Sequence, residues 1–248
     1  MESDVIVDQP TSEKKTVFAS DNVLPASLQQ ITETSQVTVS QHVDPVEVIP
    51  CCFARPSRYS LYVEGSENQL LYGQEISDCY ARQIMGAARS FALKFSDDDL
   101  VDVLKVNRTQ TCSRGCCGIC CSLPVLEVQS PPGTILAAIH ERRTCCTPRY
   151  DVLDPGGTTL FTLHPRACYP GVVALCCNIH IDIVNDQGDV MGMIEKDTSG
   201  NCKDCIGHTN NFTVKYSSTL SLEQKLILLG SSFLLDFHYF EKQNRFCC

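Results

Sequence analysis

The sequence predicts a mainly β protein in which antiparallel strands form a closed barrel, followed by one hydrophobic helix near the C-terminus. Short runs of alternating apolar and polar residues recur along most of the chain. Many of these runs are separated by the Gly, Pro, Asn and Asp residues that tight turns require. With 248 residues, of which 43% are hydrophobic, the chain can bury a sizeable core.

The first part of the chain differs from the rest. Residues 1–45 are rich in Ser, Thr, Gln and Asp, which is typical of a mobile polar N-terminal tail. Residues 1–49 contain eight acidic and two basic residues, whereas the remainder contains 21 and 18, so the net charge of −9 arises mainly here. The first residues lack the basic and apolar regions of a signal peptide, and we expect a reducing environment. No basic stripe is visible, so nucleic acid is not an expected partner.

Eleven runs after the tail are predicted to be strands, and ten of them form five hairpins. A meander of this length has two unpaired edges unless it closes, so we expect residues 46–248 to form one barrel domain. The runs span residues 58–65, 69–74, 90–95, 100–106, 123–129, 135–141, 149–154, 158–164, 178–184, 189–195 and 212–217.

A helix is predicted for residues 221–241. Its interior, residues 226–240, is apolar on nearly every side and should be buried. Fifteen residues extend only about 22 Å, less than the ~30 Å of a hydrocarbon core, and a carboxylate such as Asp236 is costly at a bilayer centre. A helix inside the barrel is therefore favoured, with a membrane span as the open alternative. The helix residues of interest are Leu226, Gly230, Phe233, Asp236 and Phe240.

Cysteine is abundant, with 17 residues, of which twelve form adjacent pairs. Neighbouring cysteines are closer along the chain than a disulfide normally allows. The densest cluster, CSRGCCGICC at residues 112–121, lies between two predicted strands near basic residues. Fatty acylation of several of these thiols would give durable membrane attachment. The candidate palmitoylation sites are Cys112, Cys116, Cys117, Cys120 and Cys121.

Two other uses of the cysteines stay open. Cys117 and Cys120, together with Cys202 and Cys205, have the spacing of zinc ligands, but 81 residues separate the two pairs. The pair at residues 247–248 follows a short polar spacer and is a second candidate for lipid attachment.

Taken together, these features resemble the phospholipid scramblase family. The resemblance covers roughly residues 28–245 and rests on VTVSQHVDPVEV, the loop CSRGCCGICC, the hairpin LEVQSPPGTILAAI and the ending GSSFLLDFHYFEK. It implies a tubby-like fold, a closed barrel of about twelve strands around a hydrophobic C-terminal helix. It also implies calcium-activated, ATP-independent movement of phospholipids between leaflets, and palmitoylation of the cysteine-rich loop.

Calcium binding carries over poorly from the family. The family's acidic segment before the helix places its acidic positions on His208, Asn210 and Thr219, none of which is a carboxylate. Calcium affinity depends on negatively charged oxygen ligands, so we expect this segment not to bind Ca²⁺ on its own. Covalent palmitate is the other expected cofactor.

The favoured interpretation is a lipid-modified phospholipid scramblase at the cytoplasmic face of the plasma membrane. The alternative is a membrane-tethered module that binds lipid or protein without transporting lipid. No family-type nucleophile signature surrounds any cysteine or histidine, so we expect no enzymatic activity. The sequence contains no G-x-x-x-x-G-K-[ST] motif that would indicate ATP use.

Overall fold

The computed structural model describes residues 24–42, 55–85, 89–109, 125–131, 133–142, 149–166, 178–196 and 211–235. Within these ranges the protein has twelve strands and three helices. The helices are α1 (Ala26–Glu33), α2 (Cys79–Met85) and α4 (Leu222–Leu235). The strands are β1 (Gln36–His42), β2 (Arg58–Val63), β3 (Leu71–Ile76), β4 (Phe91–Ser96), β5 (Asp102–Arg108), β6 (Val125–Ser130), β7 (Thr134–Arg142), β8 (Arg149–Leu153), β9 (Thr159–Pro165), β10 (Ile179–Val184), β11 (Val190–Lys196) and β12 (Asn211–Tyr216).

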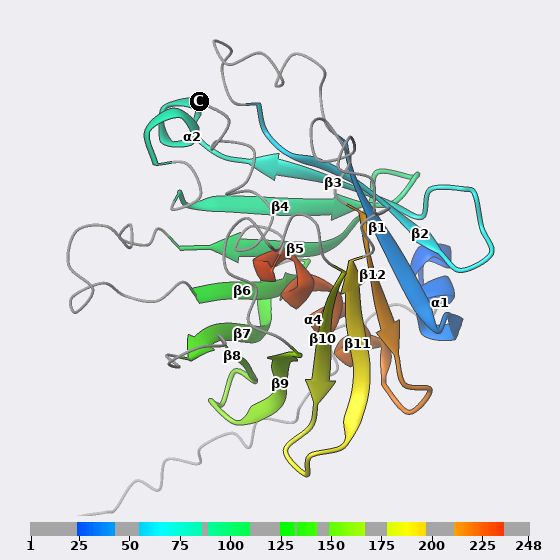
Figure 1. The fold of residues 1–248 in the computed structure, drawn as a ribbon. Coiled ribbons are helices and arrows are strands. Elements are labelled where there is room, and N and C mark those ends of the chain that lie inside the picture. The colour runs from blue at the N-terminus through cyan, green and yellow to red at the C-terminus, as the bar shows by residue number, and fades with distance from the viewer. Residues whose placement is uncertain are drawn as a thin grey trace, which may run out of the picture.

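The strands form one closed antiparallel barrel in which each strand pairs with its neighbours in sequence (Figure 1). The first and last strands complete the circle, with Val37 of β1 opposite Val214 of β12. Closure satisfies the backbone hydrogen-bonding groups of both edge strands. The predicted mainly β barrel is confirmed, and each of the eleven predicted strands overlaps an observed one.

Helix α4 lies inside the barrel and contacts β5, β6, β7 and β12 (Figure 1). It begins with a capping box, in which the Gln224 amide donates to Ser221 Oγ at 3.3 Å and the Ser221 amide donates to Gln224 Oε1 at 3.0 Å. Every residue from Lys225 to Leu235 is buried. The predicted helix is therefore confirmed over residues 222–235, and its predicted continuation to residue 241 lies outside the described residues.

The predicted tail boundary at residue 45 differs from the structure, because α1 and β1 lie within it. In β1 only Val37 and Val39 face the core, each 0% exposed, while Thr, Ser and Gln occupy the outward positions. Two inward valines are too weak a signal to stand out from a polar segment. The strand is instead stabilised by hydrogen-bonded partners on both sides, β2 and β12. The barrel therefore uses residues that composition assigns to the tail.

The two ends of the barrel differ. One end, which we call the hairpin end, carries the tight turns β2–β3, β4–β5, β6–β7, β8–β9 and β10–β11. Helix α1 lies at this end, since Ser27 Oγ donates to Asp97 Oδ2 in the β4–β5 turn at 3.3 Å. The opposite end, which we call the loop end, receives the connections β1–β2, β3–β4, β5–β6, β7–β8, β9–β10 and β11–β12. Helix α2 belongs to the β3–β4 connection, so α1 and α2 lie at opposite ends (Figure 1).

Candidate functional site

The centre of the molecule is the contact between α4 and the barrel wall. The Phe233 ring lies 5.1 Å from the Tyr59 ring, 4.9 Å from the Phe95 ring and 5.8 Å from the Phe212 ring, measured between centroids. Two of these contacts are edge-to-face, the arrangement that aromatic quadrupoles favour. The three partners come from β2, β4 and β12, so one side chain of α4 joins strands from both sides of the closing pair β1–β12.

Gly230 allows α4 to approach the wall closely. A Cβ atom at this position would lie 2.6 Å from Val128 Cγ2 and 3.4 Å from Val106 Cγ2, and the first distance is too short for a real contact. The neighbouring serines do not leave buried hydroxyls unsatisfied. Ser231 Oγ donates to the Ile227 carbonyl at 2.7 Å and Ser232 Oγ to the Leu229 carbonyl at 2.6 Å. The helix thus carries small polar residues in an apolar interior without losing hydrogen bonds.

Lys225 fixes the first turn of α4 to the end of α1. It is 3% exposed, and its Nζ donates to the carbonyl oxygens of Ile31, Thr32 and Thr34 at 3.2, 2.7 and 2.8 Å. These carbonyls belong to the last turn of α1 and its C-cap residue, where a cation is favourable. Burial lowers the pKa of the Lys225 ammonium. We call the contact between Lys225 and these three carbonyls the lysine clamp. The predicted residues Leu226, Gly230 and Phe233 follow it along α4 and lie together inside the barrel.

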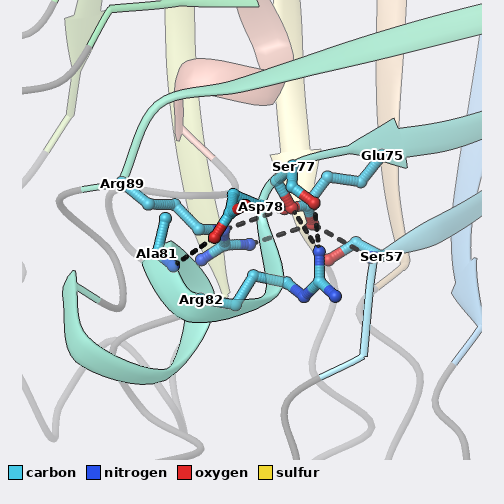
Figure 2. A network of polar contacts seen from close by, with 7 residues as sticks. All are labelled: Ser57, Glu75, Ser77, Asp78, Ala81, Arg82 and Arg89. Atoms are coloured by element: carbon cyan, nitrogen blue, oxygen red, sulfur yellow. Dashed lines mark hydrogen bonds and ion pairs between the residues drawn. The ribbon is translucent and has the colours of Figure 1, made fainter.

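The loop end contains a buried ion pair (Figure 2). Arg89 Nε donates to Glu75 Oε1 at 2.8 Å and Arg89 Nη2 donates to Glu75 Oε2 at 2.9 Å, which is a bidentate arrangement. Both side chains are at most 2% exposed. The Ser57 amide and the Ser77 hydroxyl also donate to this carboxylate, at 2.9 and 2.6 Å. The pair thereby connects the residue before β2, the end of β3 and the segment that leads into β4.

The protonation state of Glu75 follows from these partners. Burial opposes ionisation, but the Arg89 guanidinium and the hydrogen bonds from Ser77 and Ser57 outweigh it, so the pKa of Glu75 lies below its usual value. The carboxylate is therefore charged at neutral pH.

Other buried charges gather at the same end. The Arg89 and Arg108 guanidinium carbons lie 5.9 and 5.7 Å from the centre of the Phe91 ring, within the range of cation–π attraction. Among the described residues, three further charged side chains near strand ends are buried at the loop end: Arg108, Glu141 and Lys196.

The predicted palmitoylation sites, Cys112 to Cys121, lie outside the described residues, but both ends of their segment are described. Thr109 follows β5 and Val125 begins β6. The Thr109 amide donates to the Val125 carbonyl at 3.3 Å, and Arg108 pairs with Leu126 across the same two strands. The cysteine-rich segment is therefore attached to the loop end at a hydrogen-bonded base.

The degenerate calcium segment lies only partly within the described residues. Thr219 is the one predicted position that is described, and it follows β12 at the hairpin end, whereas the strand begins with Asn211 at the loop end. Six strand residues at about 3.3 Å each separate the two ends of β12 by roughly 20 Å. Thr219 Oγ1 lies 3.0 Å from Ser217 Oγ. His208 and Asn210 themselves lie outside the described residues, as do Asp236 and Phe240 of the predicted helix.

Two kinds of feature are absent from the described ranges. No group of three or more His, Cys, Asp or Glu side chains there is arranged to hold a metal. Among the helices in the described part of the chain, none is both long enough and apolar enough to cross a bilayer.

Sequence reasoning missed the ion pair and the lysine clamp. Glu75 and Arg89 are separated by 14 residues and by α2, so no helical or strand spacing relates them. Lys225 directly precedes the apolar run at residues 226–240, and its partners lie more than 190 positions earlier in the chain. The available signal was weak: a basic residue directly before an apolar helix that must enter a barrel.

Comparisons with known proteins give one consistent result. The Scramblase family profile matches residues 15–242. Phospholipid scramblase 1 of Rattus norvegicus is 29% identical over 221 residues, which cover 88% of this chain and 63% of the relative. Phospholipid scramblase 1 of Homo sapiens is 26% identical over 220 residues, 88% of this chain and 66% of the relative. Phospholipid scramblase family member 5 of Homo sapiens is 25% identical over 222 residues, 88% of this chain and 78% of the relative.

The chain thus spans less than two thirds of the length of the rat and human phospholipid scramblase 1 proteins, 63 and 66% respectively. No solved structure shows a significant match to the chain. The family match includes α1, the whole barrel and α4, so it covers the lysine clamp, the ion pair and the base of the cysteine-rich segment together.

Proposed function

This chain belongs to the scramblase family, and from that membership we propose that it moves phospholipids between the two leaflets of a bilayer without using ATP. The observation that carries the proposal is the family match over residues 15–242, which includes every described element. The relatives named phospholipid scramblase support the same activity. The sequence contains no phosphate-binding loop, which is consistent with passive transport.

The barrel interior limits where lipid could move. Eleven consecutive residues of α4 are buried against the wall, and Phe233 occupies the space between three strands. A packed interior of this kind has no room for a phosphate headgroup. We therefore place the lipid path outside the lumen of the barrel.

Membrane attachment in this proposal comes from palmitate on the cysteine-rich segment, at the cytoplasmic face of the plasma membrane. Several neighbouring thiols suit this role because one acyl chain binds a membrane weakly and a second makes attachment durable. Replacing Cys112, Cys116, Cys117, Cys120 and Cys121 with Ser should abolish acyl-exchange labelling of this segment and release the protein from the membrane fraction. Equal labelling and unchanged partition in that variant would contradict this assignment.

Calcium activation through residues 208–219 is not part of the proposal. The three positions carry no carboxylate, and β12 separates two of them. We therefore expect Ca²⁺ binding to this segment to have little effect on the rate of lipid scrambling, even at millimolar calcium.

The test of the proposed function uses purified full-length protein in liposomes that contain a fluorescent phospholipid, with a membrane-impermeant quencher added to the outside of the vesicles. Without scrambling, the quencher removes only the outer-leaflet signal, about half of the total. Scrambling brings the inner-leaflet lipid to the surface and removes most of the remainder. A protected half that persists with and without calcium would reject the transport function and favour the alternative, a membrane-tethered binding module.

A further inference from the structure

The barrel is strongly polarised in charge from end to end. At the hairpin end, the turns, α1, the first turn of α4 and the two terminal residues of each strand contain eleven acidic residues in the described ranges. The same set contains two basic residues, Lys215 and the buried Lys225. The acidic residues are Glu33, Glu64, Glu67, Asp97, Asp98, Asp99, Asp102, Asp154, Asp186, Asp189 and Glu223.

The net charge of the loop end has the opposite sign, because basic residues outnumber acidic ones there. By the same definition, its described residues include nine basic and four acidic side chains. The undescribed connections at this end add three basic and four acidic residues, which leaves the sign unchanged. The basic residues are Arg55, Arg58, Arg82, Arg89, Arg108, Arg142, Arg149, Arg166 and Lys196, and the acidic residues are Glu75, Asp78, Glu141 and Glu195.

The basic residues that reach solvent are suited to a surface partner. Arg55, Arg58, Arg142, Arg149 and Arg166 are all exposed, and they come from three strand connections, β1–β2, β7–β8 and β9–β10. Arg142 and Arg166 each pair with a carboxylate of the barrel wall, Asp151 and Asp182, at 2.7 Å. We call these five residues the arginine rim. Cations spread over three connections match a flat, extended anionic partner better than a small anion.

Most cysteines fall in the connections that begin and finish at the same end. The twelve described strands contain no cysteine, and 15 of the 17 fall in the six segments that connect strands at the loop end. The β1–β2, β3–β4 and β5–β6 connections contain two, one and five cysteines, and the β7–β8, β9–β10 and β11–β12 connections contain two, three and two. Thiols available for lipid attachment and the arginine rim thus share one end of the barrel.

We propose that the arginine rim docks on an anionic lipid surface, with the barrel standing on its loop end and its acidic hairpin end pointing away. The inference rests on the proposed membrane function. It explains how a chain of net charge −9 can approach an anionic bilayer, since only one end is attracted and the other is repelled. Attraction by the rim would also bring the cysteine-bearing connections to the membrane before any acyl chain is attached.

The competing orientation uses exposed apolar residues at the hairpin end. Leu100, at the tip of the β4–β5 turn, is 85% exposed, and Val190 is 63% exposed. Leu100 directly follows three aspartates, however, which an anionic surface repels. The loop end also offers an exposed aromatic residue, Tyr80 of α2, which is 73% exposed. Charge therefore favours the loop end.

The test compares two variants of the full chain that have the same change in net charge. The rim variant carries Arg55→Gln, Arg58→Gln and Arg149→Gln. The matched control carries Lys94→Gln, Lys105→Gln and Lys215→Gln, which remove two cations from the barrel wall and one from the hairpin end. Binding is measured by co-sedimentation with vesicles of phosphatidylcholine and phosphatidylserine, and with vesicles of phosphatidylcholine alone, after circular dichroism has verified the fold of each variant.

The rim variant should bind the anionic vesicles more weakly by about fivefold per arginine, on the order of 100-fold in total, and the control should bind like the wild type. Added salt should reduce the wild-type advantage for anionic vesicles. Equal losses in both variants would mean that net charge alone matters and would overturn the proposed orientation. Weaker binding of a Leu100→Ser variant, with full binding of the rim variant, would overturn it in favour of the hairpin end. Retained rim-dependent binding without lipid scrambling would reject the proposed function and leave the docking surface intact.

Discussion

Arg89 and Glu75 illustrate how much depends on single side chains at the loop end. Removing Arg89 leaves a buried carboxylate with no guanidinium, and breaking a buried pair in this way typically costs about 3–5 kcal/mol. We expect Arg89→Ala to lower the free energy of unfolding by this amount in urea denaturation under reducing conditions.

The matched control for Arg89 is Arg142. Its guanidinium pairs with Asp151 at 2.7 Å, but its side chain is 54% exposed. Exposed pairs contribute about 0–1 kcal/mol, so Arg142→Ala should have a small effect. Similar losses of stability in the two variants would show that burial of the Glu75 pair contributes nothing beyond a surface ion pair.

Glu75 also makes stability depend on pH. Its pKa in the folded protein lies below the unfolded value of 4.5, so the stabilisation it provides is fully present above pH 4.5 and is lost as the pH falls through the folded pKa. The difference in unfolding free energy between the wild type and Glu75→Gln should be constant near neutral pH and should shrink below 4.5. A difference that stays constant in acid would contradict the lowered pKa.

At the level of elements, α4 and the barrel wall are fitted to one another through Gly230. An added methyl group would overlap Val128, and overpacking of this kind costs about 1–3 kcal/mol. Gly230→Ala should therefore destabilise the protein even though alanine favours helix. Adding Val128→Ala should restore part of the loss, because it removes the two methyl groups that the new Cβ would meet.

The control for this pair is the single variant Val128→Ala, which should be destabilised by a cavity. A double-mutant cycle of thermal unfolding separates the two effects. If the two substitutions are additive, Gly230 is not required for close packing against β6.

The strands that the sequence predicts and the one that it misses differ in their inward residues. The strand predicted at residues 90–95, observed as β4, places Phe91, Leu93 and Phe95 in the core, and the alternation is evident from the sequence. Strand β1 has only two inward valines, and the short helix α2 carries no long apolar stripe. Such elements are specified by pairing partners distant in the chain, which local patterns do not contain.

At the level of the whole molecule, closure depends on residues before position 46. A chain that begins at residue 46 lacks α1 and β1, so β2 and β12 become open edges and Lys225 loses its three carbonyl partners. We expect this chain to aggregate in size-exclusion chromatography, because exposed strand edges pair with other chains. A chain that begins at residue 24 keeps both elements and should stay monomeric with cooperative unfolding. A monomeric, cooperatively unfolding 46–248 chain would show that β1 is dispensable.

The sequence predicts the candidate site only in part, because some of its features depend on residues that are distant in the chain. The apolar run at residues 226–235 and its burial inside the barrel follow from composition and length. The charge polarity could not be read from the sequence, because the acidic turns alternate along the chain with the basic connections. Only the alternation of strand direction in the barrel separates them into two ends.

The position of α4 has a consequence for biosynthesis. The helix that fills the barrel follows all twelve strands in the chain, so a growing polypeptide has strands to pair but nothing to pack them around until the final turns leave the ribosome. Completion of the barrel must then wait until α4 has left the ribosome, and until that point the apolar inner face of the nascent sheet is exposed and prone to aggregation.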